Sequence, residues 1–347
     1  MATEGTPASC TPMSASLPAP APRLAVLDGL RGLAALWVGL FHFTANGAFN
    51  EGFPADMPLK WLGTYGYLGV YAFFVISGFI LPWTLERGGY RLRDYGRFLW
   101  KRTLRLHPLY LLSVVTMLLP VLWGGTSSME SRTWRDWWPH FFYLNGLLNR
   151  PWLMQIYWTL ALEAQYYLAI GLIFPLLVHG KAVIRSVALA VVIGLPLLSG
   201  DTRTIVPFAA LFGIGLLIFQ HLSGRMSLRM TVPCLLVATA VTGQALGPPQ
   251  AAIGLLSAAI ILGLPLRHRF LVRLGEISYP FYLFHLAIAG VFMPWLISWP
   301  PHPWSDIMAV MGLFLLALAV SWGLNRLVER PLQAWSGRLR YRRHPGK

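Results

Sequence analysis

The stretch LDGLRGLAALWVGLFHF, Leu27–Phe43, has the composition of a membrane helix except at Arg31 and His42. Crossing the hydrocarbon core of a bilayer takes about 20 mostly apolar residues. With about 100° of turn and 1.5 Å of rise per residue, Arg31 and His42 fall on one helix face, about 16 Å apart along the axis. The pattern predicts Arg31 near one membrane surface and His42 deeper in the bilayer.

The rest of the chain has the same apolar character. Of its 347 residues 56% are hydrophobic and only 12% are charged, which excludes an ordinary soluble domain. Within a bilayer the backbone polar groups must be satisfied internally, so apolar segments form helices. We therefore predict an all-α, polytopic membrane helix bundle of about ten transmembrane helices. The expected spans are 27–45, 65–85, 107–123, 154–178, 183–199, 204–221, 231–247, 250–266, 277–298 and 305–327.

The basic residues predict the orientation of this bundle, because Lys and Arg accumulate in short cytoplasmic loops. With the N-terminus inside, the alternate loops and the two tails hold 23 of the 28 Lys and Arg residues. Both termini are therefore expected to be cytoplasmic, in the inner (plasma) membrane of a cell. The net charge of +15 then faces anionic membrane lipids, and no nucleic-acid partner is required.

The chain divides into three parts by composition. Residues 1–24 are rich in Pro, Ala, Ser and Thr and predict a disordered leader. Residues 25–331 form the membrane domain, and 332–347 form a basic cytoplasmic tail. The two cysteines, Cys10 and Cys234, imply neither a disulfide framework nor a thiolate metal site, and no metal is expected.

Ionisable residues inside or beside a span are the candidate functional residues, because burying a charge there is costly unless it is paired or hydrated. Arg31 suits either a phosphate of the inner leaflet or a ligand, and His42 suits either packing or proton transfer at neutral pH. Arg102 and Arg105 share a helix face in KRTLRLHPLY and could anchor the chain to the membrane or hold a polyanion.

Two further segments carry polar groups within apolar runs. Glu163 lies about two turns into the span that begins YWTLALE, where a carboxylate needs a partner, and Trp158 beside it is also typical of an aromatic belt. In FFVISGF, Ser77 and Gly78 are small residues that allow a close approach of a helix or a ligand.

The C-terminal half adds LGEISYPFYLFH, with Tyr282 and the second intramembrane histidine, His285, and NRLVERP, with Glu329 among arginines. Taken alone, each of these polar residues can be explained by helix packing or by ion pairing.

Taken in order, LDGLRGLAALWVGLFHF, FFVISGF, KRTLRLHPLY, YWTLALE, LGEISYPFYLFH and ERP resemble the membrane acyltransferase-3 family. These proteins modify bacterial polysaccharides, peptidoglycan, Nod factors and some antibiotics. The resemblance implies an O-acyltransferase that moves an acyl group, most simply acetyl, from cytoplasmic acyl-CoA to a hydroxyl of a carbohydrate or glycoconjugate. Acyl-CoA is then a co-substrate, and no permanently bound cofactor is expected.

The resemblance implies functional positions at Arg31, His42, Arg102, Arg105, Trp158, Glu163 and Glu329, and we add Ser77, Tyr282 and His285 as candidates because they are polar residues within the apolar runs. The catalytic set is His42, Glu163 and Glu329, and the donor-binding set is Arg31, Arg102, Arg105 and Ser77. The acceptor-binding set is Trp158, Tyr282 and His285. In the resulting hypothesis the donor phosphates bind the arginines, the pantetheine arm enters the bundle, and His42 acts as a general base or carries the acyl group.

The chain departs from the family pattern at three places. Tyr71 stands where relatives often carry an acid, Thr159 replaces a usual serine, and the chain ends soon after Pro331, where many relatives continue into an esterase-like domain. We therefore expect direct action on the acceptor or a separate partner protein. The alternative functions are a transporter of a lipid-linked sugar or small metabolite, whose path such residues also line, and a membrane scaffold.

Overall fold

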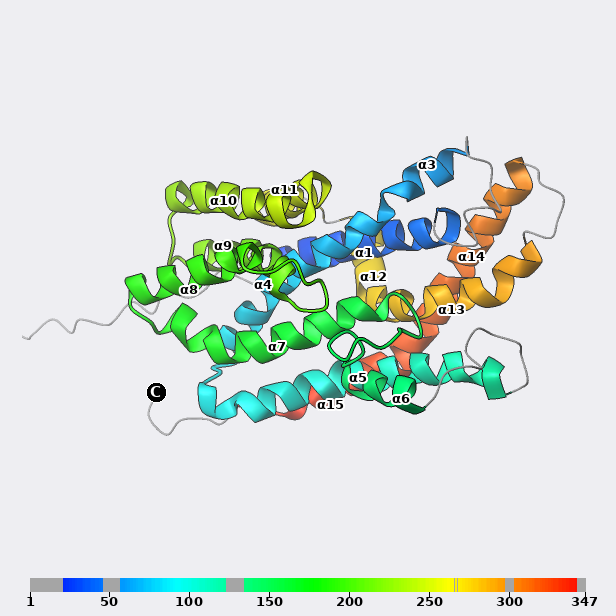
Figure 1. The fold of residues 1–347 in the computed structure, drawn as a ribbon, viewed down its shortest axis with the longest axis horizontal. Coiled ribbons are helices and arrows are strands. Elements are labelled where there is room, and N and C mark those ends of the chain that lie inside the picture. The colour runs from blue at the N-terminus through cyan, green and yellow to red at the C-terminus, as the bar shows by residue number, and fades with distance from the viewer. Residues whose placement is uncertain are drawn as a thin grey trace, which may run out of the picture.

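The computed structural model describes residues 21–45, 57–122, 134–264, 266, 268–296 and 303–341. These residues form helices joined by turns and short loops, and they contain no strand. Figure 1 shows the long helices lying roughly along one direction, as the spans of a membrane bundle do. Residues 1–20 of the predicted leader and 342–347 of the predicted tail lie outside the described residues, whereas 21–24 belong to the first helix and 332–338 to the last one.

The long helices occupy the positions that hydropathy predicts. In chain order they are α1 (Ala21–Thr44), α4 (Gly69–Arg87), α5 (Tyr95–Leu122), α7 (Tyr157–Val178), α8 (Ala182–Gly194), α9 (Ala209–Leu222), α10 (Leu228–Leu246), α11 (Pro248–Leu262), α13 (Ser278–Leu296) and α14 (Pro303–Leu324).

Shorter elements connect or extend them. They are α3 (Pro58–Thr64), η1 (Gly66–Leu68), η2 (Leu92–Asp94), α6 (Trp134–Trp137), η3 (Trp138–Phe142), η4 (Leu195–Leu197), η5 (Val206–Phe208), α12 (Arg269–Glu276), the π-helical turn η6 (Asn325–Glu329) and α15 (Arg330–Arg338).

Five of the described helical segments are long and apolar enough to cross a membrane by themselves. Four shorter apolar helical segments accompany them, at Ala182–Leu197, Val206–Leu222, Pro248–Leu262 and Ser278–Phe292. The number of ten spans and the cytoplasmic placement of both termini therefore remain predictions.

The helix α4 forms the centre of the bundle and packs against α1, α7, α9 and α11. Its crossing with α9 depends on Gly78, because a Cβ there would lie 2.2 Å from the carbonyl oxygen of Phe212. Small residues at such crossings let two helix backbones come into contact. In lipid the hydrophobic effect does not drive helices together, so this close packing stabilises their association. This contact fixes the position of Ser77, the neighbour of Gly78.

The first helix is held by an equally close contact near Arg31. A Cβ at Gly275 of α12 would lie 2.0 Å from the carbonyl oxygen of Asp28, so α1 and α12 touch through their backbones. The glycines of the LDGLRG run thus allow the short helix α12 to lie across α1. Arg31 is thereby placed at a fixed point on the side of α1 that faces α4.

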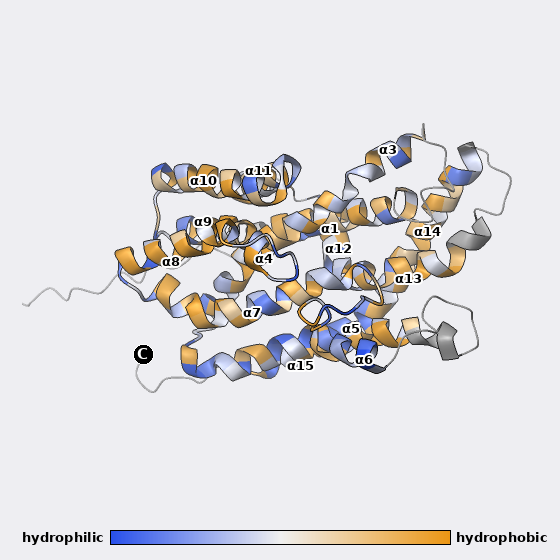
Figure 2. Cartoon of the chain, in the orientation of Figure 1, coloured by the Kyte–Doolittle hydropathy of each residue, from blue (hydrophilic) through white to orange (hydrophobic). Residues whose placement is uncertain are grey.

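The outward faces of the bundle are apolar. In Figure 2 the hydrophobic colour dominates α8, α10 and α11, whereas the hydrophilic colour concentrates on α15 and the adjoining part of α5. Only 22% of the most apolar window of α10 is buried within the chain. Such exposed apolar faces are expected where a helix contacts lipid.

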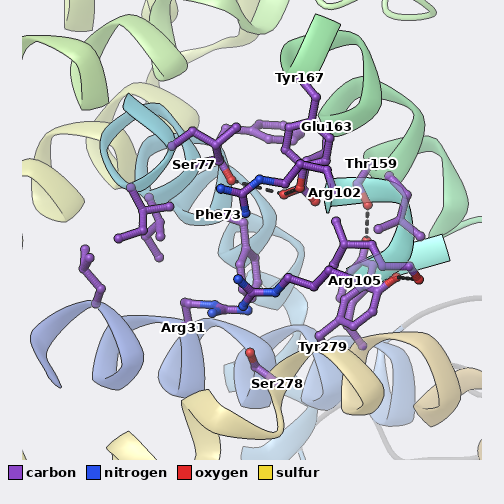
Figure 3. Close-up of a pocket in the computed structure, with 18 of the residues that line it drawn as sticks. Arg31, Phe73, Ser77, Arg102, Arg105, Thr159, Glu163, Tyr167, Ser278 and Tyr279 are labelled. Atoms are coloured by element: carbon purple, nitrogen blue, oxygen red, sulfur yellow. Dashed lines mark hydrogen bonds between the residues drawn. The ribbon is translucent and has the colours of Figure 1, made fainter. Parts of the chain in front are cut away.

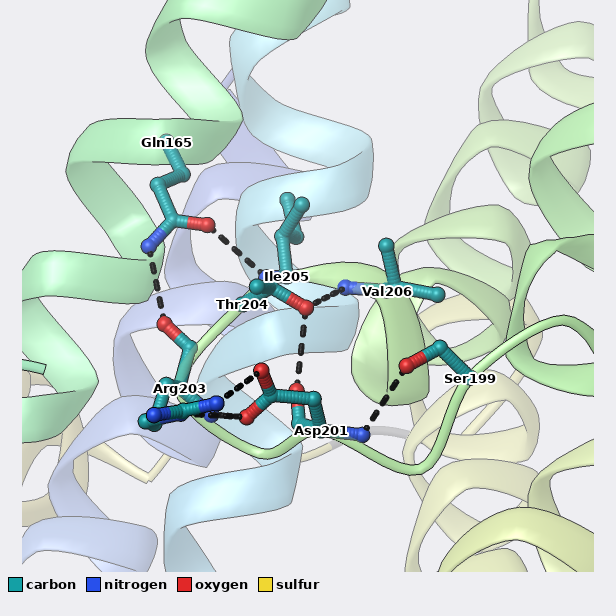
Figure 4. Close-up of polar contacts among 7 residues, drawn as sticks. All are labelled: Gln165, Ser199, Asp201, Arg203, Thr204, Ile205 and Val206. Carbon is teal, nitrogen blue, oxygen red and sulfur yellow. Dashed lines mark hydrogen bonds and ion pairs between the residues drawn. The ribbon is translucent and has the colours of Figure 1, made fainter. Parts of the chain in front are cut away.

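The loop between η4 and η5 is tied to the middle of α7 (Figure 4). The backbone N–H of Ile205 donates to Oε1 of Gln165 over 2.8 Å, and Nε2 of Gln165 donates to the carbonyl of Arg203 over 3.2 Å. Arg203 in turn donates two hydrogen bonds to Asp201, which hold the pKa of that carboxyl below its usual value. This loop steadies the turn of α7 that carries Glu163.

Candidate active site

A cavity of about 310 Å³ opens inside the bundle between α1, α4, α5, α7 and α13 (Figure 3). Most of its wall is apolar, which is typical of small-molecule sites. Its polar and charged lining residues are Asp28, Arg31, Ser77, Thr84, Arg102, Arg105, Thr159, Glu163, Tyr167, Ser278, Tyr279 and Tyr282. Five helices far apart in the sequence thus contribute to one site.

Three arginines enter this cavity from two helices. Arg31 comes from α1, and Arg102 and Arg105 come from successive turns of α5. The guanidinium of Arg102 donates to Oγ1 of Thr84 over 3.0 Å. Arg105 lies close enough to both other arginines to be repelled by them. Within the described residues none of the three has a carboxylate at ion-pair distance, so the cluster favours a bound anion.

Glu163 of α7 lines the cavity close to Ser77 and Arg102 (Figure 3). Ser77 of α4 donates to its Oε1 over 3.4 Å, and the hydroxyl of Tyr167, one turn further along α7, donates to the same oxygen. The Arg102 guanidinium lies 5.9 Å from the centre of the Tyr167 ring. The Glu163 carboxylate is therefore hydrogen-bonded and half-buried, with cationic side chains nearby.

Thr159 and Tyr282 close another part of the wall. Their hydroxyl oxygens lie 2.7 Å apart, and the Tyr282 hydroxyl also donates to the carbonyl of Ile156 over 3.1 Å. The Thr159 hydroxyl lies 2.9 Å from the same carbonyl, so the two hydroxyls share this acceptor and either can donate to the other. Thr159 thus makes a hydroxyl contact at the position where the family pattern has serine.

The two intramembrane histidines form a pair. Nδ1 of His285 lies 3.0 Å and 2.8 Å from the carbonyl oxygens of Phe281 and Tyr282, so in a neutral ring Nδ1 carries the proton and Nε2 accepts. That Nε2 lies 3.1 Å from Nδ1 of His42, which is also 2.9 Å from the carbonyl of Val38. These bonds assign the proton of neutral His42 to Nδ1 and leave a lone pair on Nε2.

The histidine pair lies beside the cavity but not in its wall. The His285 ring is 4.9 Å from the His42 ring and 6.0 Å from the ring of Tyr282, which does line the cavity. The Phe73 ring lines it as well and lies 6.2 Å from that of Tyr282. Tyr282 therefore contacts the histidine pair on one side and lines the cavity on the other, and neither histidine is among the cavity's lining residues.

Two other residues predicted for the site do not line the cavity. Trp158 packs among aromatic rings, with its ring 5.6 Å from that of Phe208. Glu329 lies buried in η6, where Asn325 and Gln333 donate to its two oxygens over 2.7 Å and 2.8 Å. In this structure Trp158 contributes to packing and Glu329 ties η6 to α15.

Comparison with known proteins agrees with this arrangement of segments. The sequence model of a family described as an acyltransferase domain matches residues 24–326, which is most of the chain. The chain belongs to the acyltransferase-3 family. It is an acyltransferase of a family of membrane proteins, and the predicted resemblance to this family is confirmed.

Two curated relatives illustrate the range of this family. The acyltransferase is 26% identical to "Acyltransferase MdmB" of Streptomyces mycarofaciens over 377 aligned positions, which cover 92% of this chain and 94% of the relative. It is 31% identical to "O-acetyltransferase OatA" of Staphylococcus aureus over 168 positions, covering 44% of this chain and 25% of that relative. No solved structure matches the chain.

The structure of this acyltransferase also brings in residues that its sequence did not single out. Asp28 lies one turn before Arg31, and Thr84 and Tyr167 contact Arg102 and Glu163. The spacing of three residues between Asp28 and Arg31 was a usable signal, because it places both on one helix face. Tyr167 gave a similar signal, because it lies four residues after Glu163 on one helix, whereas Thr84 gave none, because its partner Arg102 lies on another helix.

Proposed function

We propose that this protein is an integral membrane O-acyltransferase that moves an acyl group, most simply acetyl, from acyl-CoA to a hydroxyl of a carbohydrate or glycoconjugate. The observation that carries the proposal is the cavity itself, in which three arginines that have no ion-pair partner among the described residues face a mostly apolar interior. A CoA thioester has matching parts, namely a polyanionic end and a long, nearly neutral arm. The curated relatives are named as acyltransferases, and nothing favours the transporter alternative.

In this proposal Arg31, Arg102 and Arg105 hold the phosphates of the donor. Guanidinium groups make bidentate hydrogen bonds to phosphate oxygens. The negative phosphates would then offset the positive charge of the three arginines. The arm then extends along the apolar wall toward Thr159 and Tyr282. By the distribution of basic loops, the donor enters from the cytoplasmic side of the inner membrane.

The proposed general base is His42. Its Nε2 lone pair accepts the proton of the acceptor hydroxyl while that oxygen attacks the thioester carbonyl. The carbon–sulfur bond then breaks, the ester remains on the acceptor, and the CoA thiolate takes the proton back from His42. Because His42 does not line the cavity in this structure, the proposal requires a side-chain movement that brings its Nε2 to the acceptor hydroxyl.

The acceptor is proposed to approach through a neighbouring cavity. This cavity has a volume of about 190 Å³, lies between α5 and α7, and shares Arg102, Glu163 and Tyr167 with the larger one. A carboxylate at the junction of two cavities can accept a hydrogen bond from a substrate hydroxyl. Glu163 is therefore proposed to orient the acceptor.

Release of free CoA thiol tests the proposal. Purified protein in lipid vesicles is mixed with acetyl-CoA and a panel of hydroxyl acceptors, and the thiol is titrated over time. We expect thiol release that depends on one class of acceptor, together with an acetyl mass added to that acceptor. A complete absence of acceptor-dependent release, with transport of the same compounds across the vesicle membrane, would contradict acyl transfer.

A further inference from the structure

A third cavity, here called the α5–α15 groove, lies at the end of the bundle where α5 begins. Its volume is about 550 Å³, within the range of about 300–1,000 Å³ that is usual for ligand sites. It is lined by Thr84, Gly88, Lys101, Arg102, Arg105, Gln333, Ser336, Gly337, Arg340 and Tyr341. The groove therefore lies between the basic start of α5, the end of α4 and the C-terminal helix α15.

The groove is strongly cationic. Lys101, Arg102, Arg105 and Arg340 line it, and no acidic residue is among its lining residues. The ammonium of Lys101 lies 4.9 Å from the centre of the Tyr341 ring, and Arg340 is exposed. Like charges gathered around one hollow repel one another and attract a polyanion.

The groove adjoins the bundle cavity. Thr84, Arg102 and Arg105 line both, so one ligand can contact these arginines while its two ends lie on opposite sides of them. The outer part is polar and cationic, and the inner part is mostly apolar. A ligand with a compact anionic head and a slender neutral tail matches this change from a cationic groove to a mostly apolar cavity.

We infer that the α5–α15 groove binds the nucleotide end of acyl-CoA, the adenosine bisphosphate, with Lys101 and Arg340 contacting its 3′-phosphate. This inference rests on the proposed function and extends it by a second anion site outside the bundle cavity. Arg102 and Arg105, at the junction, then contact the pyrophosphate. A lipid headgroup would supply phosphate as well, but it would leave the inner cavity unused, because its acyl chains belong to the bilayer.

Comparison of two acyl donors tests the inference. S-acetylpantetheine keeps the thioester and the arm of acetyl-CoA but lacks the nucleotide. The variant K101Q/R340Q removes two charge-assisted contacts, each equivalent to about a tenfold change in binding. We expect the preference for acetyl-CoA over S-acetylpantetheine, measured as the ratio of kcat/KM values, to fall about a hundredfold.

The control variant R229Q/R338Q removes two exposed arginines outside the groove and is expected to keep the wild-type ratio. A wild-type ratio in K101Q/R340Q would overturn the inference. The inference would also be overturned if K101Q/R340Q lost the same fraction of kcat/KM with both donors and vesicles rich in anionic lipid restored it. That result would indicate that the groove binds a lipid headgroup.

Failure of the proposed function can be told apart from failure of this site. If wild-type protein transfers acetyl from neither donor, the function is wrong, and the groove is then tested by calorimetric binding of adenosine 3′,5′-bisphosphate. Binding to wild type that weakens about a hundredfold in K101Q/R340Q supports the site. Equal binding to both proteins, or none to wild type, overturns it.

Discussion

The ring of His42 is held by residues of two helices, and this determines which nitrogen is available. Val38, one turn earlier in α1, and His285 of α13 both lie within hydrogen-bond distance of Nδ1. His285 is itself oriented by two carbonyls of its own helix. In the proposed reaction His285 is therefore a positioning residue, which sets the tautomer of the base without touching substrate.

Replacement of His285 tests this role. His285→Leu removes one of the two acceptors at the His42 Nδ1–H and leaves only the Val38 carbonyl, so the ring is held less firmly, and we expect kcat to fall by about tenfold or more. His285→Gln keeps an acceptor oxygen and should recover part of the rate. If both variants lose activity equally while their thermal unfolding matches that of the wild type, His285 does not act through the tautomer of His42.

The arginines of the cavity predict an effect on donor affinity. Arg105→Gln removes one guanidinium from the phosphate site, and we expect the KM for acetyl-CoA to rise about tenfold with a smaller change in kcat. Arg105→Lys keeps the charge but loses the bidentate geometry and should give an intermediate KM. Steady-state kinetics at constant acceptor concentration measure kcat and KM for both variants. The control is Arg338→Gln, which replaces an exposed arginine. An unchanged KM in Arg105→Gln would argue against phosphate binding.

At this scale the sequence predicted some of the site and missed the rest. Helical spacing predicts that Arg102 and Arg105 share a face, the family resemblance adds Arg31, and the structure brings the three together. The pairing of His42 with His285 could not be predicted from spacing, since 243 residues separate them and helix packing alone determines the contact.

At the scale of elements, helix crossings at glycines place the site. The helix α4 carries Ser77 beside its close contact with α9, and α12 holds α1 beside Arg31. Apolar length predicted where the helices lie, because each span must satisfy its backbone within itself. It did not predict that α5 begins as early as Tyr95, since the basic residues of its first half hide the helical continuation from a hydropathy window.

The α4–α9 crossing gives a stability prediction. Gly78→Ala places a methyl group against the Phe212 carbonyl, and we expect destabilisation of about 1–3 kcal/mol, the usual cost of overpacking. Gly290→Ala in α13 is the matched control, because nothing lies within 4 Å of a Cβ there and alanine favours the helix. Thermal unfolding in detergent compares the two, and equal midpoints would show that the α4–α9 backbones are not in close contact.

At the scale of the whole molecule, orientation in the membrane decides which substrate enters from which side. The distribution of Lys and Arg predicts that the loop at Ser227 lies inside and the loop at Ser199 outside. Both serines are exposed in the structure. The basic α5–α15 groove would then face the cytoplasm, where acyl-CoA is made.

Thiol labelling tests this orientation. In a background with Cys10 and Cys234 replaced by serine, Ser199→Cys and Ser227→Cys are introduced singly and intact cells are treated with a membrane-impermeant maleimide. We expect labelling of Ser199→Cys only, and labelling of Ser227→Cys only after the membrane is made permeable. The reverse pattern would invert the proposed donor and acceptor sides.

The most direct test of acyl transfer through His42 compares the initial rates of two variants whose thermal unfolding matches that of the wild type. With acetyl-CoA and the acceptor found for the wild type, His42→Ala is expected to lose about 10²–10⁴-fold in kcat, as removal of a general base does. Glu163→Gln, which keeps a hydrogen-bonding side chain at the junction of the cavities, should lose less and should raise the KM for the acceptor. A His42→Ala protein that transfers acetyl at the wild-type rate would contradict the proposed mechanism.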